Sequence, residues 1–186
     1  MPSSPVLPIE WLHGRKAAAW SGVEMALGGG ATDLETSAPE DGKWDTTPPI
    51  WRVAEVPFAQ FVQIDIDLSD GSVVQLASQL DDGSGFHGLY LLLLGNTGIK
   101  HRASEPGSIY RVVSLPTVPI GELAVSVLRR DDSNAVIEAE IAVGATKLRL
   151  ISAEVYERDD GSFEIREVDE SVLLQVEGAS PAVQAA

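Results

Sequence analysis

The sequence predicts an all-β fold, an antiparallel β-sandwich or flattened barrel built largely of hairpins, with an irregular N-terminal arm rich in proline and glycine. Three observations support this prediction. Segments after residue 50 alternate between apolar and polar residues, as strands with one buried face do. Acidic motifs with glycine or asparagine separate these segments, and such motifs turn hairpins. No helical pattern of useful length follows residue 50.

The composition is that of one folded domain with extensions. The chain has 186 residues, of which 44% are hydrophobic and 22% are charged, as in typical globular proteins. We expect an N-terminal arm and loop over residues 1–49 packed on the body, a single all-β domain over 50–178, and a flexible tail over 179–186. The absence of cysteine excludes disulfides, thiol catalysis and thiolate metal sites.

The N-terminal arm differs in composition from the rest of the chain. The segment RKAAAWSGVEMAL, residues 15–27, contains good helix formers but also the Ser21-Gly22 pair, so a helix and a strand both remain open. Large aromatic side chains in such an arm either anchor it to the body by burial or form a platform for a ligand. The tryptophans of the chain, all in or beside this arm, are Trp11, Trp20, Trp44 and Trp51.

The body is expected to consist of strands in close succession. In FVQIDIDL, residues 61–68, apolar side chains alternate with Gln63, Asp65 and Asp67, so one face is buried and the other is acidic. Residues 89–94 are all apolar, which is typical of a central strand covered on both faces. The expected strands are 51–57, 60–68, 72–80, 86–94, 108–114, 122–130, 135–143, 146–157, 162–168 and 171–176.

Acidic motifs lie between these strands. The motif DDGS occurs at residues 81–84 and 159–162, with the relatives SDGS at 69–72 and DDSN at 131–134. A two-residue turn in the first hairpin would put Gln75 on the core face opposite Ile66, whereas a three-residue turn matches the apolar faces. The three-residue form is a type I turn followed by a left-handed residue, a position that glycine accepts without steric cost.

The same rule gives a register for each of the four hairpins, with Asn134 in the left-handed position of one of them. The expected pairs are Ile66–Val74 and Ile64–Leu76 in the first hairpin; Ser78–Phe86, Leu76–Gly88 and Val74–Tyr90 in the second; Val127–Ala139 and Val125–Ile141 in the third; and Val155–Ile165 and Glu157–Phe163 in the fourth.

A calcium site is the alternative interpretation of the acidic motifs. Asp65, Asp67 and Asp70 lie close together in the sequence, but an EF-hand loop needs a glutamate six residues after its glycine, where this chain has Ala77. The turn interpretation is therefore preferred, and we expect no metal and no cofactor.

No catalytic set stands out in the sequence. The histidines His13, His87 and His101 lack the spacing of a zinc site. A GxSxG elbow is absent, and the glycine-rich segment MALGGGATD lacks the lysine of a phosphate-binding loop. His87 with Asp81 or Asp82 is a conceivable acid/base pair, but a strand-end histidine beside a turn explains it more simply. We therefore expect a protein that is not an enzyme.

The charge balance constrains the partners. The formal net charge is −15, from 28 acidic and 13 basic residues. Such a surface repels nucleic acid and anionic membranes and favours encounter with a basic protein. The N-terminus has no secretory or transit pattern, and the longest apolar run is too short to span a bilayer. We expect a soluble protein of the cytoplasm.

Three classes of function are compatible with these features. The preferred one is an acidic protein-binding module, in its sharpest form a small cytosolic inhibitor or immunity-type antagonist that docks on a basic partner. The alternatives are a structural or assembly β-sandwich of phage or secretion-system type, and a barrel-mouth ligand-binding protein with residues 88–98 and the tryptophans as its lining. The expected partner-binding residues are Asp65, Asp67, Glu138, Glu140, Glu157, Glu164, Trp44 and Trp51, with turn residues Asp159 and Asp160 beside them.

Overall fold

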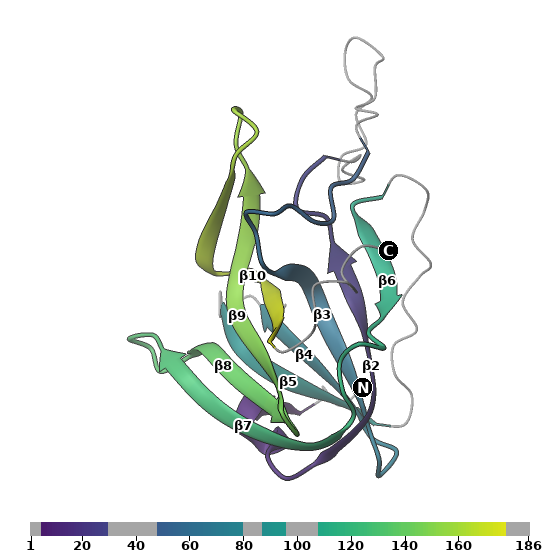
Figure 1. Ribbon diagram of the computed structural model, residues 1–186. Coiled ribbons are helices and arrows are strands. Elements are labelled where there is room, and N and C mark those ends of the chain that lie inside the picture. Colours follow the sequence, from purple (N-terminus) through teal and green to yellow (C-terminus); the bar gives the residue numbers. More distant parts are fainter. Residues whose placement is uncertain (1–4, 30–47, 80–86, 96–107, 178–186) are drawn as a thin grey trace.

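The computed structural model describes residues 5–29, 48–79, 87–95 and 108–177, and these residues confirm the all-β prediction (Figure 1). The only helical element in these ranges is one 3-10 turn, η1. The elements of the chain, in sequence order, are β1 (Val6–Pro8), η1 (Ile9–Leu12), β2 (Lys16–Met25), β3 (Ala59–Leu68), β4 (Val73–Gln79), β5 (His87–Gly95), β6 (Tyr110–Ser114), β7 (Gly121–Arg130), β8 (Val136–Val143), β9 (Thr146–Glu157) and β10 (Phe163–Glu177).

The strands form one antiparallel sheet that closes partly on itself. Its ten strands follow the order β1-β5-β4-β3-β10-β9-β8-β7-β2-β6, and an additional pairing joins β3 to β2. The ring therefore runs through β3, β10, β9, β8, β7 and β2, with β4, β5 and β1 extending from one side (Figure 1). Between β2 and β7 the seam is short, because only Lys16–Glu122 and Ala17–Gly121 are paired.

Residues 16–25, for which the sequence left helix and strand open, are the strand β2. The Ser21-Gly22 pair is compatible with a strand here because β2 approaches β3 very closely. A Cβ atom on Gly22 would lie 2.7 Å from the carbonyl oxygen of Gln63. Glycine is therefore the residue that permits this strand pairing.

The prediction of a strand at residues 51–57 is wrong. This stretch forms a loop with isolated bridges, Gly28–Ile50 and Val53–Val56. Pro49 and Pro57 lack the N–H groups that a regular ladder requires. The loop is still anchored, because Val56 and Phe58 are buried.

The two strands expected at 162–168 and 171–176 are parts of one strand, β10, with an irregularity between Glu167 and Val172. Val168, inside this bulge, has a φ of 61°. That value is unusual for a β-branched residue and marks a strained backbone. The alternating pattern was therefore interrupted by a bulge and not by a turn.

Three of the four hairpin registers are confirmed. The pairs Ile66–Val74, Val125–Ile141 and Val155–Ile165 occur as expected, with their neighbours in step. In these three turns the left-handed position is taken by Gly71 (φ 86°), Asn134 (φ 70°) and Gly161 (φ 77°).

The acidic residue of each of these turns serves the turn itself. Asp70 Oδ1 accepts hydrogen bonds from the backbone N–H and the hydroxyl group of Ser72, at 2.9 and 2.5 Å. Asp160 accepts the same pair of bonds from Ser162. The hydroxyl and backbone hydrogen bonds from Ser72 hold the pKa of Asp70 below its ordinary value. These motifs therefore shape hairpins, as the sequence predicted.

The register expected between residues 72–80 and 86–94 is wrong. Leu76 pairs with Leu91 and Val74 with Leu93, in place of Gly88 and Tyr90. The parity is reversed, so Leu89 and Leu91 face the core. The loop motif alone did not fix the loop length. The expected Asp81–Gly83 turn and the residue Phe86 lie outside the described residues.

The apolar run at residues 89–94 predicted a central strand, but β5 does not lie in the middle of the sheet. It lies between β4 and the three-residue strand β1. Leu89, Tyr90 and Leu91 are buried, whereas Leu92, Leu93 and Leu94 are half-buried. Its uninterrupted apolar run therefore reflects burial of its first half more than a position in the middle of the sheet.

Two hydrophobic cores cover opposite faces of β9 and β10. The larger core includes Phe61, Trp20 and Leu150, and the smaller one packs Phe58 and Val56 against Val155. The smaller core attaches the 50–58 loop to the sheet. No helix in the described residues is long and apolar enough to cross a membrane.

Candidate functional site

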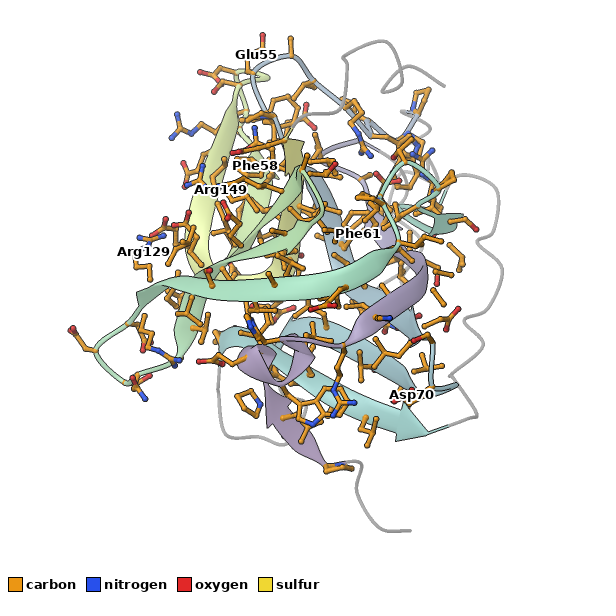
Figure 2. All side chains as sticks on the ribbon, turned by 60° about the horizontal axis from the view of Figure 1, so that its bottom comes forward. Glu55, Phe58, Phe61, Asp70, Arg129 and Arg149 are labelled. Carbon is orange, nitrogen blue, oxygen red and sulfur yellow. The ribbon has the colours of Figure 1, made fainter. Side chains whose placement is uncertain are left out.

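A groove of about 860 Å³ opens where β2, β3, β6 and β10 come together. Most of its lining is apolar, with aromatic rings from Phe58 and Phe61 (Figure 2). Among the described residues, the lining consists of Glu24 of β2; Arg52, Val53, Ala54, Val56, Pro57 and Phe58 of the loop before β3; Ala59 and Phe61 of β3; Arg111, Val113 and Ser114 of β6; Leu115, Pro116, Thr117 and Val118 after β6; and Leu174, Gln175 and Val176 of β10.

A buried carboxylate lies in the wall of this groove. The side chain of Glu24 is only 1% exposed. It shares a face of β2 with Trp20, which belongs to the main core. A buried carboxylate is unfavourable unless cations or hydrogen bonds compensate it. The surrounding residues therefore have to supply positive charge.

Two arginines from different parts of the chain supply that charge. Arg111 Nε donates a hydrogen bond of 2.7 Å to Glu24 Oε2. Arg52 Nη1 forms an ion pair with the other oxygen, Oε1, and donates to the carbonyl oxygen of Trp51. Each carboxylate oxygen thus faces its own guanidinium group. Both arginines remain about two-fifths exposed toward the groove opening.

Trp51 completes this charged end of the groove. The guanidinium carbon of Arg111 lies 4.0 Å from the centroid of the Trp51 ring, a cation–π arrangement. The tryptophan and Glu24 together fix both the plane and one edge of the Arg111 guanidinium group. Trp51, which the sequence analysis expected among the partner-binding residues, is therefore next to the groove. Trp44 lies outside the described residues.

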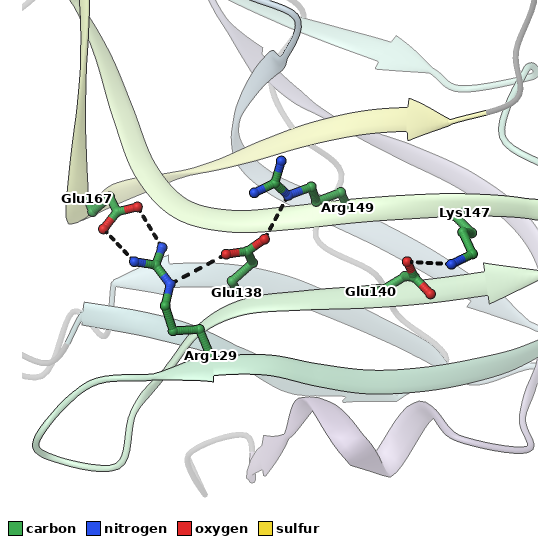
Figure 3. A network of polar contacts seen from close by, with 6 residues as sticks. All are labelled: Arg129, Glu138, Glu140, Lys147, Arg149 and Glu167. Atoms are coloured by element: carbon green, nitrogen blue, oxygen red, sulfur yellow. Dashed lines mark hydrogen bonds and ion pairs between the residues drawn. The ribbon is translucent and has the colours of Figure 1, made fainter.

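The expected acidic docking residues Glu138 and Glu140 have partners in their own chain (Figure 3). Glu138 lies between Arg149, at 2.7 Å, and Arg129, at 3.4 Å. Glu140 pairs with Lys147 at 3.1 Å. Glu138 is also buried. Their charges are therefore largely neutralised by neighbouring strands.

The network around Arg129 extends to β10. The guanidinium group of Arg129 donates two hydrogen bonds to Glu167, at 2.9 and 2.5 Å. The hydrogen bond from Arg129 lowers the pKa of Glu167. The row of alternating charges in Figure 3 thus ties β7, β8, β9 and β10 together on their outer side.

The two expected residues on the β9–β10 hairpin are also engaged. Glu164 accepts hydrogen bonds from Arg166 and Arg158, which lower its pKa. Glu157 accepts a 3.1 Å bond from the backbone N–H of Gly29. Asp159 and Asp160 are exposed at the hairpin tip.

Asp65 and Asp67 lie on β3, which pairs with β2 and β4. Asp65 is half-buried and accepts a hydrogen bond of 3.1 Å from Gln63, whereas Asp67 is exposed. The expected docking residues are therefore distributed over β3, β8 and the β9–β10 hairpin. Most of those described here take part in contacts within the chain.

A second polar cluster surrounds the bulge of β10. Asp169 accepts a hydrogen bond of 3.0 Å from the Tyr156 hydroxyl group, and Glu154 accepts one of 3.3 Å from Ser171. Burial, reinforced by the charge of Asp169, raises the pKa of Glu154 to about 7. Burial and the hydrogen bond to Asp169 raise the pKa of Tyr156 to about 12.

This bulge cluster is not a metal centre. No group of three or more histidine, cysteine or acidic residues in the described part of the chain is arranged to hold a metal ion. His13 accepts a hydrogen bond from the backbone N–H of Val125, so its role there is structural.

The sequence interpretation missed both the groove and the bulge cluster. The charged residues of the groove come from three distant places in the chain, Glu24, Arg52 and Arg111. One signal was present: Glu24 has the same parity as Trp20 in segment 16–25, which puts a carboxylate on a buried face if that segment is a strand. For the bulge, Ser152, Glu154 and Tyr156 continue the core-facing positions of Leu148 and Leu150.

No protein-family model matches this chain, and comparisons with curated proteins and with solved structures find no significant match. Inference about function therefore depends on the chemistry of the groove and of the charged surface.

Proposed function

We propose that this protein binds a small molecule with an apolar body, which lies in the groove between β3, β6 and β10. The observation that supports this proposal is the groove itself. Its volume of about 860 Å³ falls within the range of about 300–1,000 Å³ that is usual for small-molecule sites. Such sites combine an apolar lining with a few polar groups that orient the ligand, as Glu24, Arg52 and Arg111 do here.

The residues that line the groove favour ligand binding over catalysis. Phe58, Phe61 and Leu174 are lining residues that are buried in the cores, so the wall behind the groove is apolar and held in place by packing. Burial of apolar ligand surface contributes about 25 cal/mol per Å² before the costs of association. The charged residues at the groove end are engaged with one another, which suits recognition of a ligand more than proton transfer.

A neutral, environment-sensitive fluorophore tests this proposal. The probe 1-N-phenylnaphthylamine should bind with enhanced emission, and 1-decanol should displace it. Val113→Trp should abolish the binding because Val113 lines the groove, and the larger side chain would occupy it. Val112→Trp is the matched control, because neighbouring residues of a strand point to opposite faces and Val112 is 46% exposed. Equal probe binding by both variants would remove the groove from consideration.

Docking on a basic protein is a second proposal. It is supported by the net charge of −15, since 13 basic residues cannot neutralise 28 acidic ones. An inhibitor or immunity-type role in the cytoplasm is its sharpest form. Because Glu138, Glu140 and Glu164 have internal partners, the exposed Asp67 and Asp159 are the better contacts to test.

Salt dependence tests the second proposal. A basic partner should be captured from the source cell at low ionic strength and released at high ionic strength, with most of the change in the association rate. Asp67→Lys/Asp159→Lys should weaken the capture. If neither salt nor charge reversal affects it, the acidic surface serves solubility alone.

A further inference from the structure

We infer that the ligand of the groove carries a carboxylate, which binds Arg111 and Arg52 at the charged end while the apolar body lies along the hydrophobic walls. This inference rests on the proposed small-molecule function and adds the chemical class of the ligand.

The charge at this end of the groove supports an anionic ligand. Two guanidinium groups, those of Arg52 and Arg111, face the single carboxylate of Glu24. The cluster therefore has a formal excess of one positive charge, opposite in sign to the protein as a whole. An anion in the groove would neutralise that excess in surroundings where apolar walls reduce screening by water.

The geometry of Arg111 supports a carboxylate in particular. Its Nε is bonded to Glu24 at 2.7 Å, and its plane rests on the Trp51 ring at 4.0 Å. Within the part of the chain described by the structure, its two terminal nitrogens donate no hydrogen bond. A planar guanidinium group with a fixed edge and a fixed face presents its remaining donors as a fork, which matches the two oxygens of a carboxylate.

The size of the excess charge favours a carboxylate over a multiply charged anion. One negative charge matches the excess, whereas a dianionic phosphate would add repulsion from the adjacent Glu24. Arg52 contributes from the other side of Glu24, where its Nη1 also contacts the Trp51 carbonyl oxygen. The two arginines therefore form a cationic rim around one end of an apolar groove.

Three ligands with the same ten-carbon chain separate head-group recognition from apolar binding. Decanoate, 1-decanol and decylamine compete at neutral pH with the neutral fluorophore for the groove. Decanoate should bind at least about tenfold more tightly than decanol, as expected for charge-assisted hydrogen bonds, and decylamine more weakly than decanol.

Substitutions at Arg111 locate the recognition. Arg111→Gln should remove the preference for decanoate and leave decanol binding unchanged, whereas Arg111→Lys should retain part of the preference. Arg158→Gln changes the net charge equally on the β9–β10 hairpin, outside the groove lining, and should have no effect. If Arg111→Gln does not fold, Glu24→Gln/Arg52→Gln/Arg111→Gln removes the buried carboxylate together with both of its cationic partners and serves as the test.

The outcomes distinguish the two levels of the proposal. Equal affinity of the wild-type protein for decanoate and decanol overturns the carboxylate inference and leaves small-molecule binding intact. A loss of preference as large in Arg158→Gln as in Arg111→Gln also overturns it, because a general charge effect then explains the result. Binding of none of the three ligands, nor of the fluorophore, overturns the proposed function and this inference together.

Discussion

The hydroxyl oxygens of Ser78 on β4 and Ser152 on β9 lie 2.6 Å apart, and both side chains are fully buried. Ser78 also donates to the carbonyl oxygen of Asp169, at 2.5 Å. These contacts join the extension of the sheet to the ring at the bulge of β10. Because both side chains are fully buried, each hydroxyl group depends on the other residues of the cluster for hydrogen bonding.

Ser78→Ala should lower the free energy of unfolding by about 1–3 kcal/mol, because Ser152 and the Asp169 carbonyl group lose a buried partner. Urea denaturation measures this change. Ser78→Ala/Ser152→Ala should cost less than the sum of the single substitutions, since the two residues share one interaction. Strict additivity would contradict the contact.

Gly71→Val should lower the free energy of unfolding by about 1–2 kcal/mol, because valine is forced to a positive φ. Space is not the reason, since a Cβ on Gly71 would meet no atom within 4 Å. Thermal and urea denaturation give the value. Gly71→Asn is the control and should be much milder, as asparagine already occupies this position in the turn at Asn134. Added calcium should not change the melting temperature of any of these variants.

Glu154 should make the protein less stable at alkaline pH. Its pKa is raised from 4.5 to about 7, so the folded state binds the proton more tightly than the unfolded state. The stabilisation is complete below the unfolded pKa and is lost as pH rises through about 7. The charged groups around Glu154 are Asp169 and Glu170 of the bulge and Arg166 opposite it on β10.

Glu154→Gln isolates this contribution. The variant should gain about 1 kcal/mol over wild type between about pH 5 and about pH 8, a value reduced because the carboxyl group is only partly buried. Urea denaturation at the two pH values measures it. A difference between the variant and wild type that does not change with pH would contradict the raised pKa.

Leu91→Ala should lower the free energy of unfolding by about 2–5 kcal/mol, because Leu91 is fully buried in the main core. Leu92→Ala should cost clearly less, since Leu92 is half-buried on the opposite face of β5. Chemical denaturation of both variants compares the two faces directly. The reverse order would restore the face assignment that the sequence suggested.

The fold was predictable where local chemistry and strand parity agree. At residues 69–71 and 159–161, glycine at the left-handed position and matched apolar faces leave a single register. The β4–β5 pairing failed because residues 89–94 are apolar on both faces, so parity could not reveal a slip. The choice between helix and strand for β2 stayed open in the sequence. Gly22 is required because the Gln63 carbonyl oxygen approaches it closely, and this approach exists only in the assembled sheet.

The candidate site was much less predictable. The alternating pattern correctly assigned Glu138 and Glu140 to the side of β8 opposite the core. It could not reveal the cations on neighbouring strands that neutralise these two residues. Arg149 lies beside Glu138 only because β9 returns along β8, and Arg129 only because β7 precedes it. The groove depends even more on tertiary structure, since Glu24 acquires Arg52 and Arg111 from loops and strands that are distant in the sequence.

The segment that joins β6 to β7 has a kinetic consequence. Residues 115–119, which follow β6 and border the groove, are held to Trp20 by two hydrogen bonds, from Leu115 N–H to the Trp20 carbonyl and from the Trp20 indole to the Pro119 carbonyl. Release of these two bonds, together with withdrawal of the buried Val118 side chain from the main core, would open the wall of the groove while the ladders of β8, β9 and β10 stay intact. The residence time of a bound molecule would then be set by this local opening and would not follow the unfolding rate of the whole domain.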